Sequence, residues 1–95
     1  MNIKDLHTED KAVSAISLFK SEKGNETSIR ILKDQLLKEH ITQIPALLVC
    51  INGNVFFENE KGQKVELQPG DYTLIEPMVK HWVQATIDSH LILFK

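Results

Sequence analysis

The sequence predicts an all-β domain, an antiparallel sandwich or barrel of about nine or ten short strands. Short apolar runs follow one another at close and regular spacing along the 95 residues, with turn residues between them. No amphipathic helix of useful length appears in this pattern. The pattern alone leaves open a jelly roll, an immunoglobulin-like sandwich or a small open barrel. An immunoglobulin domain usually has a pair of cysteines, and this chain has one cysteine.

The first half of the chain leads to its most apolar strand. Residues 13–19 form the first apolar run, and residues 27–32 alternate and are rich in β-branched side chains, which is typical of a strand. Residues 33–39 have some helix propensity. They are too few for a helix between strands, so we interpret them as a loop leading to a short strand at 40–42. The run 46–51 is apolar on both faces, which predicts a strand that is buried on both sides.

The second half alternates short strands with turns. Asn52-Gly53 is a strong hairpin signal between the apolar run before it and a strand expected at 55–58. Further strands are expected at 65–67, 72–75, 82–86 and 91–94, with turns at 60–62, 69–71 and 88–89.

Composition narrows the class of protein. One quarter of the residues are charged and the formal net charge is -2, with Lys and Arg scattered along the chain, which argues against a nucleic-acid-binding surface. No apolar stretch approaches the roughly 20 residues that cross a membrane, and no secretory signal is visible. The single cysteine, Cys50, fits a reducing compartment, most simply the cytoplasm. We expect a polar arm or a short leading strand at residues 1–11 and one domain at 12–95.

One segment of the second half carries a family resemblance. A Gly70-Asp71 turn leads into a strand, Pro77 lies in a second turn, and His81 opens the next strand. This order and the Gly-to-His separation resemble the second motif of the cupins, in particular small single-domain cupins of the RmlC-like type. The chain departs from that motif at three positions: Glu76 stands where the proline usually lies, Met78 replaces a glycine and Ala85 replaces an asparagine.

A degenerate form of the first cupin motif lies upstream. His40 fits its first histidine and Gly53 its terminal glycine. Other motif positions have changed: Thr42 stands at the second histidine, Ala46 at the glutamate, and Asp34 at the glycine that normally precedes the motif. The resemblance implies a double-stranded β-helix, that is, a jelly-roll cupin barrel, and a homodimer. Of the four metal ligands of the family it leaves His40 and His81.

The candidate site follows from strand alternation and from this resemblance. His40 and Thr42 share one face of a strand, whereas Glu39 points to the other. The resemblance places the His40 face inside the barrel with His81, and we also include Cys50 in the candidate ligand pocket. A metal site needs three or four ligands. His40 and His81 are candidate ligands of a divalent Zn, Fe, Ni or Mn ion, while Glu76 and His90 are substitutes without positional support.

Three functions are compatible with these motifs and with this strand pattern. The first is binding of a small molecule in the barrel interior near His40 and His81, which the short ligand set favours. The second is a metal-dependent enzyme of the dioxygenase or isomerase type, for which the sequence names no catalytic residue. The third is a regulatory or structural partner of another protein. Cys50 lies in an apolar run and is interpreted as a buried small side chain rather than a nucleophile.

Overall fold

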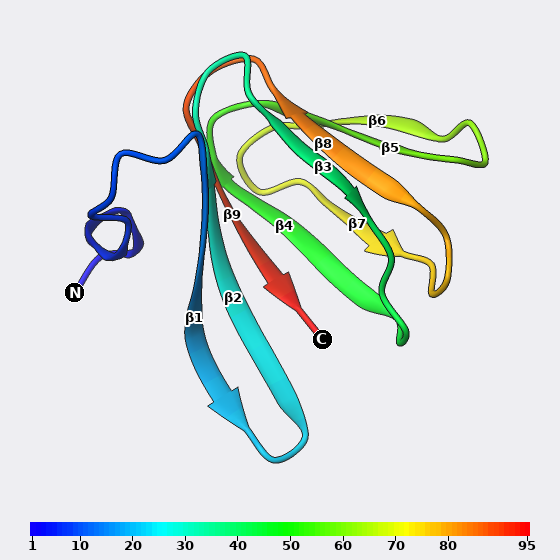
Figure 1. The fold of residues 1–95 in the computed structure, drawn as a ribbon, viewed down its shortest axis with the longest axis horizontal. Coiled ribbons are helices and arrows are strands. Elements are labelled where there is room, and N and C mark those ends of the chain that lie inside the picture. The colour runs from blue at the N-terminus through cyan, green and yellow to red at the C-terminus, as the bar shows by residue number, and fades with distance from the viewer.

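The structure, a computed structural model, describes all 95 residues and consists of nine strands in two antiparallel sheets (Figure 1). It confirms the prediction of an all-β jelly roll. The elements are η1 (Ile3–Leu6), β1 (Val13–Ser21), β2 (Gly24–Ile31), β3 (Leu36–His40), β4 (Ala46–Asn52), β5 (Val55–Asn59), β6 (Lys64–Leu67), β7 (Tyr72–Ile75), β8 (His81–Ala85) and β9 (Ser89–Phe94). The one helix, η1, has four residues, and no helix could cross a lipid bilayer.

The two sheets face each other around one core. The larger sheet has the order β1-β2-β9-β4-β7 and the smaller the order β3-β8-β5-β6. Figure 1 shows the β1–β2 hairpin extending beyond the rest of the barrel, with the N-terminal arm beside β1. The core is a cluster of 12 buried residues contributed by both sheets, with Phe57, Ile31 and Leu48 among its largest members.

Alternation of side chains explains which face of each strand is buried. In β5, Val55, Phe57 and Asn59 are buried, and the residues between them are half-buried. In β4, Leu48 is buried, whereas Leu47 on the opposite face is half-buried and Ile51 is exposed, so the prediction of a strand buried on both sides holds for one face only. The outer face of the larger sheet is therefore itself rich in apolar side chains.

The hairpin predicted at Asn52-Gly53 is wrong, although the turn is present. The strands that flank it belong to different sheets, so the turn carries the chain across the barrel instead of pairing β4 with β5. Gly53 has φ 95°, and a Cβ atom added there would lie 2.2 Å from Ser89 Oγ. The glycine is thus required by close approach to the start of β9 as well as by its backbone angle.

The short strand predicted at 40–42 is also wrong, because β3 occupies most of the segment interpreted as a loop. Leu37 pairs with Val83 and His40 pairs with His81, with a shift in register between the two pairs. Pairing with β8 therefore decides the structure of this segment, and the weak helix propensity does not. Asp34, at φ 63°, lies in the turn that precedes the strand.

Candidate functional site

The two histidines singled out from the sequence lie opposite each other. His40 is the last residue of β3 and His81 the first residue of β8, and the antiparallel register pairs them directly. Their ring centroids are 6.3 Å apart. His40 is exposed, and its Nδ1 lies 2.5 Å from the carbonyl oxygen of Lys38. We call this part of the barrel, where β3 ends and β8 begins, the histidine end.

His81 is a buried histidine packed on an aromatic ring. Its side chain is 6% exposed and stacks on Phe57, with centroids 5.7 Å apart. Burial lowers the pKa of His81, and the charges of His40 and Lys95 lower it further, whereas the carbonyl of Val79, 3.4 Å from Nδ1, acts in the opposite direction. The imidazole is therefore held neutral near pH 7, so one ring nitrogen remains a hydrogen-bond acceptor.

Thr42 lies just beyond β3 and is buried without a partner for its hydroxyl group. The residue is 6% exposed, and its Oγ1 makes no hydrogen bond. Its carbonyl accepts a hydrogen bond of 2.8 Å from the backbone N–H of Met78, which fixes the position of the loop. A buried hydroxyl group without a partner costs about 1 to 3 kcal/mol, so this atom is available to a ligand or a water molecule.

Thr42 also lines a hollow of about 580 Å³ between the tip of the β1–β2 hairpin, the β3–β4 loop and Lys95. Its charged side chains are Lys20, Lys23, Lys95 and Glu22. A second hollow, of about 370 Å³, is lined by Glu39, His40, Ile41 and Lys80 and shares Ile41 with the first. The two hollows meet at Ile41, and His40 lines the smaller one. Sequence reasoning missed these lysines because the hairpin, the loop and the last residue are far apart along the chain.

Cys50 lies away from this group. It is fully buried near the end of β4, two residues before the turn at Asn52-Gly53, and its Sγ donates to the carbonyl of Asn52 at 3.5 Å. His81 pairs with Asn59 at the far end of β5 from that turn. Burial and the charge of Asp71 raise the pKa of the Cys50 thiol, which keeps it protonated. The structure thus brings His40, Thr42 and His81 to one end of the barrel and leaves Cys50 near the other.

Comparison of the fold with solved structures identifies the architecture. A cupin superfamily protein from Desulfitobacterium hafniense DCB-2 superposes with a TM-score of 0.85 over 98% of this chain and 84% of its own, at 13% identity. The chain has a cupin fold. An RmlC-like cupin protein from Desulfovibrio desulfuricans gives a TM-score of 0.80 at 18% identity, over 90% of this chain and 83% of that one. KdgF from Halomonas sp. gives 0.78 at 19% identity, over 92% and 82%. No family model and no curated protein matches the sequence.

A metal of the kind that cupins hold does not fit the residues at the histidine end. His40 and His81 supply two imidazoles, and no group of three His, Cys, Asp or Glu side chains is close enough to bind an ion. Two imidazoles fall short of the three protein ligands of a catalytic zinc or non-haem iron site. The ring of His81 is in addition packed flat against Phe57, with 24° between the ring planes.

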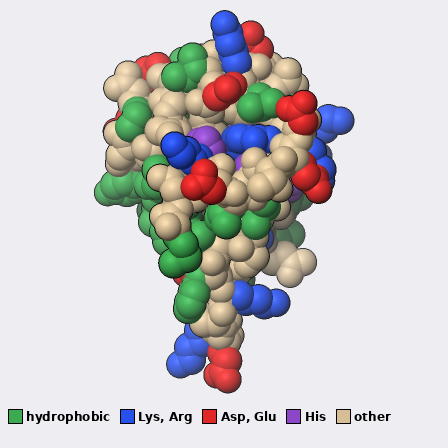
Figure 2. Space-filling view, turned by 90° about the vertical axis from the view of Figure 1, so that its left-hand side faces the viewer, with side chains coloured by type: hydrophobic (Ala, Val, Ile, Leu, Met, Phe, Trp, Pro, Cys, Tyr) green, Lys and Arg blue, Asp and Glu red, His purple; other side chains and the backbone are tan.

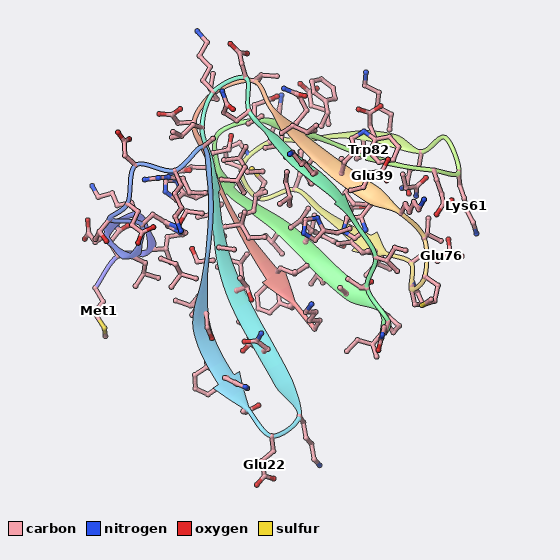
Figure 3. The ribbon with its side chains drawn as sticks, in the orientation of Figure 1. Met1, Glu22, Glu39, Lys61, Glu76 and Trp82 are labelled. Carbon is pink, nitrogen blue, oxygen red and sulfur yellow. The ribbon has the colours of Figure 1, made fainter.

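The other side chains considered as metal ligands, Glu39, Glu76 and His90, make contacts elsewhere in the structure. Glu39 lines a surface groove with Trp82, and the two are labelled side by side in Figure 3. Glu76 forms an exposed ion pair of 2.7 Å with Lys61, also visible in Figure 3. His90 belongs to the larger sheet, where its Nδ1 lies 3.0 Å from Asn52 Oδ1.

Proposed function

We propose that this chain is a small cupin that binds a small molecule at the histidine end, without a metal and without catalysis. The observation that carries the proposal is the buried hydroxyl group of Thr42, which has no partner and lies beside the larger hollow. His40 lines the smaller hollow, and the buried His81 pairs with it across β3 and β8; each imidazole can donate or accept a hydrogen bond. Polar groups converging on a hollow of this size are typical of small-molecule sites.

The charges around the two hollows favour an anionic ligand. Four lysines line them, namely Lys20, Lys23, Lys80 and Lys95, against the carboxylates of Glu22 and Glu39. The positive charge of Lys95 is one of the causes that lower the pKa of His81. A small carboxylate or phosphate monoester therefore suits the hollow better than a cation.

A thermal-shift screen of small carboxylates and phosphate monoesters tests this function. A ligand at ten times its Kd stabilises the folded chain by about 1.4 kcal/mol, which raises Tm by roughly 5 to 10 °C in a domain of this size. We expect the shift to be lost in Thr42→Val and reduced in Lys20→Gln/Lys23→Gln. Thr73→Val, a buried threonine in β7, and Lys33→Gln are the matched controls. The proposal is wrong if no compound raises Tm, or if the shift survives in Thr42→Val.

We also propose that two copies of the chain associate through the outer face of the larger sheet. Six apolar side chains from three adjacent strands lie on that face: Leu47, Val49, Tyr72, Leu74, Ile92 and Phe94. Tyr72 is 66% exposed and Leu74 is 72% exposed. Monomeric proteins rarely expose a continuous apolar patch of this kind, and a two-fold dimer covers the same patch on both subunits.

A further inference from the structure

The N-terminal arm is docked on the larger sheet through the side chain of His7. The Nδ1 atom of His7 lies 2.8 Å from Ser14 Oγ on β1, and its Nε2 atom lies 2.9 Å from Ser28 Oγ on β2. His7 is 6% exposed and Ser28 is completely buried. Both serines lie on the outer face of the sheet, so the arm itself covers them. The imidazole is therefore packed between the arm and strands β1 and β2.

Arg30 of β2 holds the backbone of the same arm at three points. Its guanidinium group donates to the carbonyl oxygens of His7 at 3.1 Å, Glu9 at 2.7 Å and Lys11 at 3.1 Å. These acceptors are neutral, and the carboxylate of Glu9 instead pairs with Lys11 at 2.8 Å. The positive charge of Arg30 therefore remains without a carboxylate partner.

A second histidine stands beside His7. His90 of β9 pairs with Arg30 across the sheet, and its ring centroid lies 5.7 Å from that of His7. Its Nε2 atom is buried and has no hydrogen-bond partner. Figure 2 views the molecule from the side of the arm, where histidine side chains lie next to Lys and Arg side chains, with Asp and Glu side chains around them.

The residues of the strands that contact His7 are neutral or basic: Ser14 on β1, Ser28 and Arg30 on β2, and His90 on β9. Glu26 lies on the same face of β2, two residues before Ser28, and is not among the charges that shift the pKa of His7. Asp88, in the turn before β9, raises the pKa of His90, and its Oδ1 accepts a hydrogen bond from the backbone N–H of Lys33. A proton gained by His7 would thus place a second positive charge beside Arg30 in a largely buried contact.

We propose that residues 1–12 form a pH-operated latch, docked on the sheet while His7 is neutral and released when His7 binds a proton. The two serine hydroxyls can accept from a charged imidazole as well as exchange hydrogen bonds with a neutral one, so the loss comes from burial and repulsion. Release uncovers Ser28 and Arg30 next to Ile92, which belongs to the proposed dimer face.

The direction of the pH effect follows from the pKa shifts. Burial lowers the pKa of His7, with further lowering from His90 and Arg30, and the pKa of His90 is lowered by burial and by Arg30 and raised by Asp88. The released arm has the ordinary His pKa of about 6.5 and therefore binds protons more readily than the docked arm. The docked state has its full stability above a pH of about 6.5 and loses stability as the pH falls toward the lowered pKa of His7.

A nitroxide spin label on Asp10→Cys measures the latch in the full-length chain. Asp10 is exposed and makes no side-chain hydrogen bond, while Cys50 is fully buried and remains unlabelled. We expect an immobile spectrum at pH 8 and a mobile one at pH 5, with the fluorescence of Trp82 unchanged between them. In His7→Gln the pH-dependent change should disappear, whether the arm stays docked or stays free. His90→Gln removes one repelling charge, so its transition should move to higher pH.

His40→Gln is the matched control, because it removes an imidazole far from the arm and should leave the transition as in the wild type. Three results overturn the latch: a label whose mobility does not change between pH 8 and pH 5, a transition that persists in His7→Gln, or a change in Trp82 fluorescence that accompanies release, which would mean that the whole domain unfolds.

Discussion

His40 and His81 face each other across the β3–β8 pair with 6.3 Å between their ring centroids, and no third metal-binding side chain joins them. His40 is exposed and His81 is buried against Phe57. The pair lies next to a buried threonine hydroxyl and a hollow with several lysines instead of further ligands. Polar side chains thus gather at this end of an otherwise apolar core.

Metal content is the first prediction. Protein purified without an affinity tag or chelator should contain well below one Zn, Fe, Ni or Mn ion per chain by elemental mass spectrometry, because two imidazoles alone bind such ions weakly. The His40→Ala/His81→Ala variant should give the same background. Near-stoichiometric metal in the wild type, lost in the variant, would contradict the prediction and favour a metal-dependent enzyme.

Met78→Gly should stabilise the fold. Met78 has φ 64° and is 64% exposed, so it occupies a left-handed conformation with little packing to lose. Glycine relieves that strain but gains freedom in the unfolded chain, which leaves a net gain of about 0.5 to 1 kcal/mol in the free energy of unfolding by urea denaturation. Gly70→Ala is the converse control, since Gly70 has φ 91° and open space around it. It should destabilise by a similar amount, and a stabilised Gly70→Ala would refute the argument.

The stability of the fold should fall in acid partly through His81. Its lowered pKa means that the unfolded chain binds a proton more readily, so its contribution is complete above pH of about 6.5 and is lost as the pH falls toward the folded pKa. One such group changes the free energy of unfolding by at most about 1.4 kcal/mol per pH unit. His81→Gln should therefore show a shallower dependence between pH 7.5 and 5.

His40→Gln is the comparison variant: the charge of His40 lowers the pKa of His81, so its loss should make the slope shallower by less than His81→Gln does. His7 and His90 act in the same direction, so the slope in His81→Gln is reduced and not abolished. If His81→Gln folds poorly, the NMR titration of the His81 ring in the wild type gives the same information. An unchanged slope, or a ring that titrates above pH 6.5, would disprove this account.

Leu74→Glu should turn the proposed dimer into a monomer. Leu74 lies on the edge strand β7, beside Leu47 in the proposed apolar patch, and a carboxylate there would be buried without a partner in a two-fold interface. Sedimentation velocity at micromolar concentration should give one chain for the variant and two for the wild type. Ile87→Glu is the control, because Ile87 is 50% exposed in the turn before β9. A monomeric wild type would rule out the dimer.

Local sequence patterns determined most of the strands and the turns between them. Alternation in 65–67 and the apolar run that became β4 were sufficient to predict these strands, because successive side chains of a strand point to opposite faces. The resemblance left two candidate metal ligands, His40 and His81, and in the structure no group of three His, Cys, Asp or Glu side chains is close enough to bind an ion.

The tertiary structure alone decided which strands pair and which distant residues meet. The turn at Asn52-Gly53 looks like a hairpin locally, but its strands join different sheets, and β3 forms because β8 is there to pair with it. The same holds for the contact of His7 with Ser28 and for the hollow that Lys20, Thr42 and Lys95 line together. Periodicity reports the face on which a side chain lies, whereas its neighbours depend on long-range pairing that no local window of sequence contains.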